Sequence, residues 1–580
     1  PHPRMHPPLL LPLLLLLFPS LSSSLGFLSR QSLLLPPLPH AGVHDTTLRW
    51  HTQRLDHFDF TQTRTFQQRV FSYNKHWAGP GAPILFYCGN EANVELYVNA
   101  TGLMWERAAE LGALLIWVEH RYYGSSLPFA PGTGWETNAS LLRWLSSEQA
   151  LADYAAVIYD LKRELGAPDS PVIALGGSYG GMLAAWLRLH YPNAVVGAIA
   201  ASAPVLAFDG LAHPVAGLPA YSPFEGVRYW QVVSHDASSA AGAAERCAAG
   251  VHATWPVLFR LAKTASGRQV LSREFRLCQP LENEDGGESL AAMLLNVWDT
   301  LAMGNFPYAS NYLIYQQGAD PSILLPPWPV KAACAAFAKL PLDEADTPPS
   351  TSVASATSRA LREEAVSQVT GHRKQPVPDG KGARLAPARG AADPIAEEVQ
   401  LLRAMAVAAG VLYNASKQSQ CLQLPADVNF DGIWDWQFCT ERLPQETYFP
   451  LEAETTMFWD RPYGEEKIVE HCRKKYGIEP RPNWIAATTG FGDGRRYTGS
   501  SFKAEAAPGG ASNIVFSNGV LDPWRSGGVA TNLSDSVLAF TVEEGAHHLD
   551  LMWSNPQDGD SVKRVRDAEV EQMRLWVRGG

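Results

Sequence analysis

The chain has 580 residues, 46% of them hydrophobic, so it exceeds one ordinary domain and can form a core domain plus a second folded region or a large insertion. Its formal net charge is -11 at pH 7 and no long run of Lys or Arg occurs, which excludes the electrostatic footprint of a protein that binds nucleic acid or an anionic membrane. We therefore expect small molecules or peptides as partners.

Residues 1–26 have the pattern of an export signal. Arg4 and two His residues precede an apolar run from Leu9 to Phe18, and small polar residues follow it. The run is shorter than the roughly 20 residues that span a bilayer, although the apolar Leu33 to Leu35 leave a signal anchor as the alternative. We expect the chain to enter the secretory pathway, to reside in the lysosome, in a vacuole or outside the cell, and to leave the membrane once the signal is removed.

Runs typical of buried strands alternate with amphipathic helices from about residue 82, as in a doubly wound α/β protein. The first predicted strands are Pro83–Cys88 and Ala113–Val118. A helix is predicted to begin at Ser146, because Ser146 and Gln149 match a capping box and apolar residues follow at helical spacing.

The next segment carries the most specific local motif. A predicted strand over Pro171–Leu175 leads into the sequence GGSYG, which ends at Gly180, and a helix and a further strand over Val195–Ser202 follow. The pentapeptide fits G-x-S-x-G, the nucleophile elbow of the α/β-hydrolase fold, in which a sharp turn lifts a Ser to the top of the sheet. The alternative is a glycine turn with an ordinary Ser. The strand before the motif and the helix after it favour Ser178 as a nucleophile.

The α/β pattern stops near residue 207 and returns with strands over Ser512–Gly519 and Ser536–Val542 and a last helix near Ala568–Val577. The sheet is thus predicted to be built from both ends of the chain, as an α/β-hydrolase doubly wound sheet that carries a large insertion.

The predicted domain organisation has three parts. Residues 45–206 and 486–580 form the α/β-hydrolase domain, and residues 207–485 form a mainly helical, disulfide-bearing cap inserted between them. Within the cap, residues 341–398 are rich in Ala, Pro, Ser and charge, so we expect this stretch to be disordered, or to be an artefact of the gene model.

Cysteines and glycosylation sequons agree with export. Six of the seven cysteines lie within the predicted cap and allow three disulfides in an oxidising compartment; they are Cys247, Cys278, Cys334, Cys421, Cys439 and Cys472. Cys88 ends an apolar strand and is expected to be a buried free thiol. No Cys or His spacing indicates zinc, so neither a metal nor a cofactor is expected. Four Asn-x-Ser/Thr sequons could carry glycans, at Asn99, Asn138, Asn414 and Asn532.

The two remaining members of a catalytic triad are predicted from the two late strands. An α/β-hydrolase presents Ser, acid and His in this chain order, with the acid and the His on loops at the carboxyl ends of strands. Asp522 and His547 occupy these places. His547 would accept the proton of Ser178, and Asp522 would orient the imidazole. Asp550 and His548 are the competing candidates, with a surface pair or a helix cap as their alternative role.

The oxyanion hole is expected to combine two backbone N–H groups. One belongs to Tyr179, which follows the nucleophile, and the other to the loop after the strand Pro83–Cys88. Asn90 is our candidate for the second donor, with an ordinary turn residue as the alternative.

Motifs spread along the chain resemble one family, the serine exopeptidases that comprise lysosomal Pro-X carboxypeptidase and dipeptidyl peptidase II. They are QRLDHFDF (53–60), FYCGNEANVE (86–95), EHRYYGSSLPF (119–129), SSEQALADYA, GGSYGGMLAAW, FPYASNYL (306–313), SNGVLDPW and GAHHLDL. The resemblance covers about residues 53 to 580 apart from inserts, and it implies the triad Ser178, Asp522 and His547 beneath a helical cap. It also implies three disulfides, Cys247–Cys334, Cys278–Cys421 and Cys439–Cys472.

Both relatives cleave after proline, and they differ in the end of the peptide that they recognise. The motifs FPYASNYL and GGMLAAWL are more similar to those of the carboxypeptidase, which releases the residue after a penultimate proline. Asp435 in WDWQ is closer to the dipeptidyl peptidase, which uses a carboxylate to hold a substrate ammonium, although Asp435 could equally be a solvated turn residue. We expect a Pro-X carboxypeptidase acting on proline-containing peptides, with a dipeptidyl peptidase as the alternative.

Further expectations concern the substrate pocket and other classes of protein. A proline ring needs flat apolar walls, and Met182 and Trp524 are candidates for them, with simple core packing as the alternative. An esterase or lipase is disfavoured because the HGGG-type loop is missing from the sequence. An inactive binding module is disfavoured because Ser, Asp and His are all present. The oligomeric state stays open, with a homodimer as one candidate.

Overall fold

The computed structural model describes residues 40–208, 226–316, 320, 322–340, 394–424, 432–482, 484–490 and 510–579. The predicted export signal, residues 1–26, lies outside the described residues, and so does most of the stretch expected to be disordered, residues 341–393. Among the described residues, no helix has both the length and the apolar character needed to cross a membrane.

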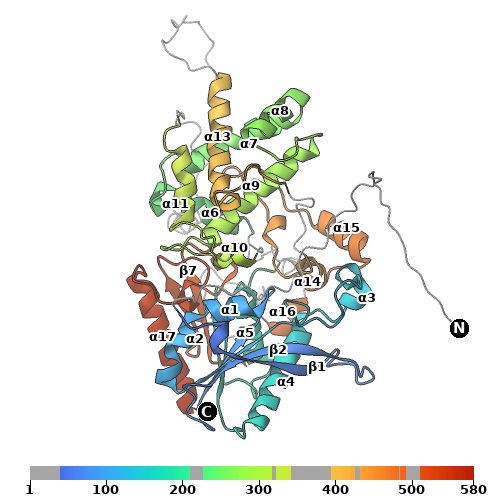
Figure 1. Cartoon of the computed structure of the whole chain (residues 1–580), viewed down its shortest axis with the longest axis vertical. Helices are drawn as coiled ribbons and strands as arrows, with labels where there is room; N and C mark the ends of the chain where they lie inside the picture. The colour runs from blue at the N-terminus through green and yellow to red at the C-terminus, as the bar shows by residue number, and fades with distance from the viewer. Residues whose placement is uncertain are drawn as a thin grey trace, which may run out of the picture. The chain divides into compact units, whose positions relative to one another are not determined.

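One mixed sheet of eight strands forms the centre of the fold, in the order β1-β2-β4-β3-β5-β6-β7-β8 (Figure 1). The strands are β1 (Thr47–Arg54), β2 (Thr65–Tyr73), β3 (Ile84–Cys88), β4 (Leu114–Val118), β5 (Val172–Gly177), β6 (Gly197–Ala201), β7 (Ile514–Gly519) and β8 (Val537–Val542). β2 pairs antiparallel with β1 and β4, and the other neighbours are parallel. This is the α/β-hydrolase sheet, with β7 and β8 supplied by the end of the chain.

Helices cover both faces of this sheet, so its central strands are buried throughout. Every residue of β3 to β7 is buried, which explains their continuous apolar runs. Alternate residues serve opposite faces: Phe86 packs with α4 and α5, and Tyr87 packs with α1, α2 and α17. The helices are α1 (Val94–Ala100), α2 (Gly102–Leu111), α4 (Ser147–Glu164), α5 (Tyr179–His190) and α17 (Asp560–Gly579).

The predicted strands agree with the structure, the capping box forms only in half, and the first hairpin was missed. The Ser146 hydroxyl accepts a hydrogen bond from the Gln149 N–H at the start of α4, but the Gln149 side chain bonds to the His57 N–H and Asp56 and not back to Ser146. The sheet begins with β1 and β2, before the region where sequence periodicity was clear. β1 lies at the edge of the sheet with most of its residues exposed or half-buried, so it lacks the apolar run that identifies a central strand.

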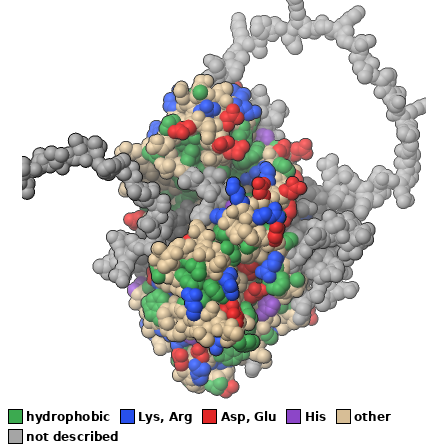
Figure 2. Space-filling view, turned by 90° about the vertical axis from the view of Figure 1, so that its right-hand side faces the viewer, with side chains coloured by type: hydrophobic (Ala, Val, Ile, Leu, Met, Phe, Trp, Pro, Cys, Tyr) green, Lys and Arg blue, Asp and Glu red, His purple; other side chains and the backbone are tan. Residues whose placement is uncertain are grey.

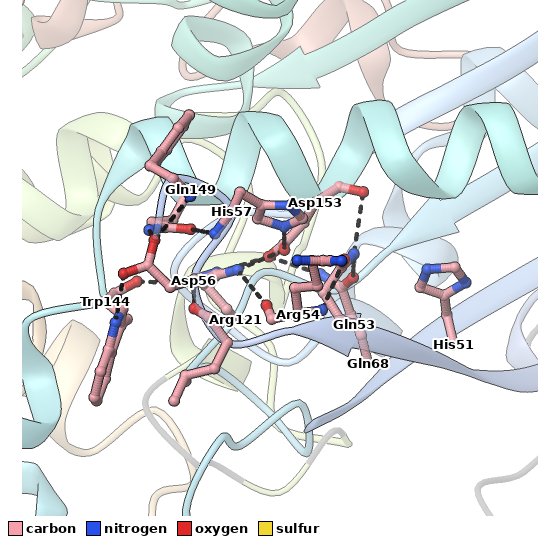
Figure 3. A network of polar contacts seen from close by, with 12 residues as sticks. His51, Gln53, Arg54, Asp56, His57, Gln68, Arg121, Trp144, Gln149 and Asp153 are labelled. Carbon is pink, nitrogen blue, oxygen red and sulfur yellow. Dashed lines mark hydrogen bonds and ion pairs between the residues drawn. The ribbon is translucent and has the colours of Figure 1, made fainter. Parts of the chain in front are cut away.

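A buried charge network holds this hairpin against α4 (Figure 3). Arg121 and Asp153 are fully buried, and the guanidinium Nε donates to the Asp153 carboxylate over 2.7 Å. His57 contacts the same carboxylate at 2.7 Å, and Arg121 also donates to the Leu55 carbonyl. Burial acts to raise the pKa of Asp153, but Arg121 and His57 outweigh it and lower the pKa below its ordinary value.

Helices between β6 and β7 form a second hydrophobic core, the cap. Its main helices lie side by side in Figure 1; they are α6 (Val227–Asp236), α7 (Cys247–Ala262), α8 (Ala265–Glu274), α9 (Asp285–Met303), α11 (Pro329–Cys334) and α13 (Pro394–Tyr413). Because α13 begins at Pro394, the end of the stretch predicted to be disordered is helical instead. The later apolar residues of α13, such as Leu402 and Met405, pack into the cap core and stabilise the helix, which extends back to Pro394.

The three disulfides have the pairing that the family resemblance implies. Cys247–Cys334 lies in the cap core, and Cys278–Cys421 lies nearer the surface and joins the segments that follow α8 and α13. Cys439–Cys472 joins α14 (Trp434–Glu441) to α15 (Glu465–Tyr476). Cys88 is a buried free thiol, as predicted. On the face drawn in Figure 2, acidic and basic side chains are interspersed and are not collected by sign.

Candidate active site

The turn between β5 and α5 has the geometry of a nucleophile elbow. Ser178 lies there with φ 59° and ψ -129°, a backbone conformation that costs a non-glycine residue about 1 to 3 kcal/mol. Its N–H donates to the Ala201 carbonyl of β6 over 2.9 Å, which holds the turn to the sheet. Ser178 is half-buried, although its neighbours Gly177 and Tyr179 are buried. The turn therefore brings the Ser toward solvent at the carboxyl end of β5.

Asn90 ties the loop after β3 to this elbow. Its Nδ2 donates to the Gly177 carbonyl over 2.6 Å, and its Oδ1 accepts from the Tyr87 hydroxyl over 3.2 Å. A Cβ at Gly180 would lie 2.2 Å from Asn90 Oδ1, so the motif requires glycine at that position. The Asn90 side chain thus holds the loop, and only its backbone N–H could serve the predicted oxyanion hole.

Asp522 and His547 lie together at the ends of β7 and β8. His547 Nδ1 is 3.1 Å from each carboxylate oxygen of Asp522. Asp522 is fully buried, and one of its oxygens also accepts the Trp524 N–H over 3.1 Å. A carboxylate only accepts, so Nδ1 carries the proton, and the neutral His547 keeps Nε2 as its acceptor. This is the tautomer that a general base for Ser178 needs.

The competing candidates, His548 and Asp550, are buried and have other partners. His548 Nε2 lies 3.1 Å from the Tyr312 hydroxyl, and the His548 ring lies where a Cβ of Gly177 would be, only 2.7 Å away. Burial, together with the neighbouring His547, lowers the pKa of His548 well below its ordinary value. Asp550 accepts from the Ser517 hydroxyl over 2.7 Å. Neither forms the surface pair that was the alternative expectation.

The two candidates for the proline pocket lie in different hydrophobic clusters. Met182 is on α5, 1% exposed, and packs in the cluster that contains Tyr179 and Leu443. Trp524 packs in the cap core, edge-on to Tyr229 at 4.8 Å between ring centroids. Trp524 therefore connects the loop of Asp522 to the cap.

Asp435 is held inside the α14–α15 pair, which corrects both expectations for this residue. It is fully buried, neither a solvated turn residue nor a carboxylate open to a substrate ammonium. His471 Nε2 lies 2.9 and 3.1 Å from its two oxygens, and Lys475 Nζ lies 2.8 Å from one of them. Burial acts to raise the pKa of Asp435, but these two partners lower it below its ordinary value.

Two polar residues near the elbow were missed by the sequence analysis. Gln437, on α14, bonds to the Tyr179 hydroxyl over 2.9 Å across 258 positions of sequence. Glu91 follows Asn90 and lies near enough to His547 for their charges to interact. Both belong to quoted motifs, WDWQ and FYCGNEANVE, but no local spacing relates them to the nucleophile.

The comparisons with known proteins identify the family. Residues 53–339 and 395–569 match the family described as Serine carboxypeptidase S28. The chain belongs to this family. It is 36% identical to lysosomal Pro-X carboxypeptidase of Homo sapiens over 530 residues, which cover 91% of this chain and 87% of that protein.

Other known proteins are also similar to this chain over most of their length. Prolyl carboxy peptidase like protein 5 of Caenorhabditis elegans is 33% identical, over 90% of this chain and 88% of that protein. Thymus-specific serine protease of Mus musculus is 27% identical, over 91% and 87%. As a member of this family, the chain is a serine peptidase.

Proposed function

We propose that this S28 peptidase is a Pro-X carboxypeptidase, which hydrolyses the bond between a penultimate proline and the C-terminal residue of a peptide. The observation that carries this choice is the engagement of Asp435, because its ion pairs with His471 and Lys475 remove the acid that suggested recognition of a substrate ammonium. The 36% identity to lysosomal Pro-X carboxypeptidase of Homo sapiens supports the same choice.

In the proposed mechanism, Ser178 Oγ attacks the carbonyl carbon of the proline residue while His547 Nε2 accepts the hydroxyl proton. Asp522 stabilises the imidazolium that forms. The backbone N–H groups of Tyr179 and Asn90 receive the oxyanion of the tetrahedral intermediate. His547 then donates its proton to the leaving amine, and water hydrolyses the acyl-enzyme by the same steps.

Met182 and Trp524 remain our candidates for the walls of the proline pocket. Met182 is on the helix that begins beside Ser178, and Trp524 is two residues after Asp522. Both side chains are apolar, which suits a pyrrolidine ring because its nitrogen is acylated and has no proton to donate, but both are buried in this structure and a neighbouring side chain must move to expose them.

A dipeptidyl peptidase is the second candidate, and Glu91 is the observation that favours it. One carboxylate oxygen of Glu91 is buried without a hydrogen-bond partner among the described residues. An acid so placed near His547 could receive a substrate ammonium through a charge-assisted hydrogen bond worth about 1.5 to 3 kcal/mol. Glu91→Gln would then lower kcat/KM only for peptides with a free N-terminus.

We also propose that the protein works in the secretory pathway, in a lysosome or vacuole or outside the cell, on proline-containing peptides. Its three disulfides support an oxidising compartment. Asn138 and Asn532 are exposed and accessible to glycosylation, whereas Asn99 and Asn414 are half-buried.

Chemical blocking of each end of a peptide tests the proposed specificity. We expect peptides that end in Pro-X to be cleaved equally well with a free or an acetylated N-terminus, and to resist cleavage when the C-terminus is amidated. Loss of cleavage on acetylation, together with tolerance of the amide, would instead establish the dipeptidyl peptidase.

A further inference from the structure

The side chain of Tyr179 lies between α14 and the loop after β4, next to the nucleophile. Tyr179 is the first residue of α5 and is 2% exposed. A first-turn N–H has no partner within its own helix, which leaves the Tyr179 N–H available for an oxyanion. The direction of that N–H depends on the backbone at the start of α5, and the buried ring anchors this backbone.

Gln437 of α14 bonds to the Tyr179 hydroxyl with a defined orientation. Gln437 Nε2 lies 2.9 Å from the Tyr179 oxygen, and Gln437 Oε1 lies 2.7 Å from the Tyr123 hydroxyl. Gln437 also interacts with Glu441, one turn later on the same helix, and lowers the pKa of its carboxyl in part. The Tyr123 hydroxyl donates to the amide oxygen and the amide NH2 donates to the Tyr179 oxygen, so the oxygen faces Tyr123 and the NH2 faces Tyr179.

The remaining proton positions follow from this orientation. Because the Tyr179 oxygen accepts from Gln437, its own proton is free for His120 Nε2, which lies 3.1 Å away. His120 Nδ1 lies 2.7 Å from the Arg121 carbonyl and must donate to it, which leaves Nε2 as the acceptor. Burial lowers the pKa of His120 to about 4, so the ring stays neutral above that pH.

Both ends of this chain of hydrogen bonds are anchored. Arg121 is fixed by the buried Asp153 pair of Figure 3. Glu441 accepts from the Ser147 N–H over 3.0 Å and from the Ser147 hydroxyl, which joins α14 to the start of α4. The Trp434 ring, also on α14, meets the Tyr179 ring edge-on at 5.0 Å. Tyr179 is thus held from α14 on one side and from the loop after β4 on the other.

We propose that Gln437 is a positioning residue, through which α14 holds Tyr179 and so keeps the oxyanion-binding N–H beside Ser178 in place. α14, which the chain supplies between β6 and β7, is then part of the catalytic machinery. This inference rests on the proposed nucleophile and oxyanion hole, and it is independent of the end of the peptide that the enzyme reads.

Two substitutions of the full-length enzyme, alone and combined, test the proposal. Gln437→Met removes the amide at similar volume, and Tyr179→Phe removes the hydroxyl and keeps the ring. The readout is the rate constant for labelling of Ser178 by a fluorophosphonate, a substrate-independent reaction that also needs the oxyanion hole. We expect each variant to be labelled about ten- to a hundred-fold more slowly, as for a small displacement of one catalytic donor. We expect the double variant to be no slower than the slower single variant.

Gln149→Met is the matched control. Gln149 is also buried, and its amide makes two hydrogen bonds, to the His57 N–H and to Asp56, within the network of Figure 3. The Gln149→Met substitution should lower the thermal midpoint and leave the labelling rate of the folded enzyme unchanged. The proposal is overturned if folded Gln437→Met and Tyr179→Phe enzymes are labelled at the wild-type rate, or if their effects multiply in the double variant. Absence of wild-type labelling at Ser178 would instead refute the proposed nucleophile.

Discussion

His547 and His548 follow one another in the chain, yet their rings face different partners. His547 Nδ1 faces the buried Asp522 carboxylate, and His548 Nε2 faces the Tyr312 hydroxyl. Only the first arrangement places a carboxylate beside the imidazole, as the orientation of a catalytic base requires. The His548 ring packs against Gly177 of the nucleophile elbow.

Substituting each His by Ala distinguishes the catalytic role from the packing role. We expect His547→Ala to lower kcat by roughly four to six orders of magnitude, because the proton acceptor is lost. His548→Ala should mainly lower the thermal midpoint, because it leaves a cavity, and should reduce kcat far less. Steady-state kinetics and thermal unfolding measure both effects. If His548→Ala were inactive and His547→Ala were active, the catalytic base would be His548.

For Asp435 we predict a role in the stability of the fold and not in catalysis. Its folded-state pKa lies below the ordinary value, so its ion pairs stabilise the fold above about pH 4, and this contribution is lost as the pH falls through the lowered pKa. Asp435→Asn should cost about 3 kcal/mol near pH 7 and much less near pH 3, with kcat/KM on acetylated peptides preserved. Thermal unfolding across this pH range is the measurement. If the variant kept the wild-type thermal midpoint but cleaved peptides with a free N-terminus much more slowly, Asp435 would instead belong to the substrate site.

At the scale of elements, the sequence was most informative where structure is local. The elbow, the strands around it and the two late strands were predicted, because buried parallel strands carry apolar runs and the motif fits between a strand and a helix. The hairpin β1–β2 was missed because an edge strand needs no such run. The contact of Gln437 with Tyr179 was missed because it joins distant segments and leaves no periodicity in either.

Residues 341–393 provide a test of the cap. Their composition predicts a segment that buries little apolar surface, and Cys334 on one side and α13 on the other belong to the packed cap. Replacing 341–393 by a short Gly-Ser linker should leave kcat/KM and the thermal midpoint nearly unchanged. A large fall in either quantity would assign the segment to the folded cap.

At the scale of the molecule, the buried Glu441 makes the fold more stable at acidic pH than at neutral pH. Glu441 joins α14 to the start of α4, and burial raises its pKa from the ordinary 4.5 to about 7, although Ser147 and Gln437 lower it in part. The folded state therefore binds a proton that the unfolded state releases, so stability falls as the pH rises from about 4.5 to about 7.

Glu441→Gln removes this dependence. We expect the wild-type free energy of unfolding to fall across that interval by an amount on the order of 3 kcal/mol from this group, and the variant to lack this part of the fall. Chemical denaturation at pH 4.5 and pH 7 measures the difference. The same pH slope in both proteins would show that Glu441 does not hold the proton.

The most direct test of the central claim is the identity of the first product from one peptide. The substrate is an unblocked peptide with proline at position two and at the penultimate position, and mass spectrometry follows its early digestion, with Ser178→Ala as the inactive control. Our account predicts that the C-terminal residue alone is released and that Ser178→Ala releases nothing. Release of the N-terminal dipeptide, or turnover by Ser178→Ala, would contradict it.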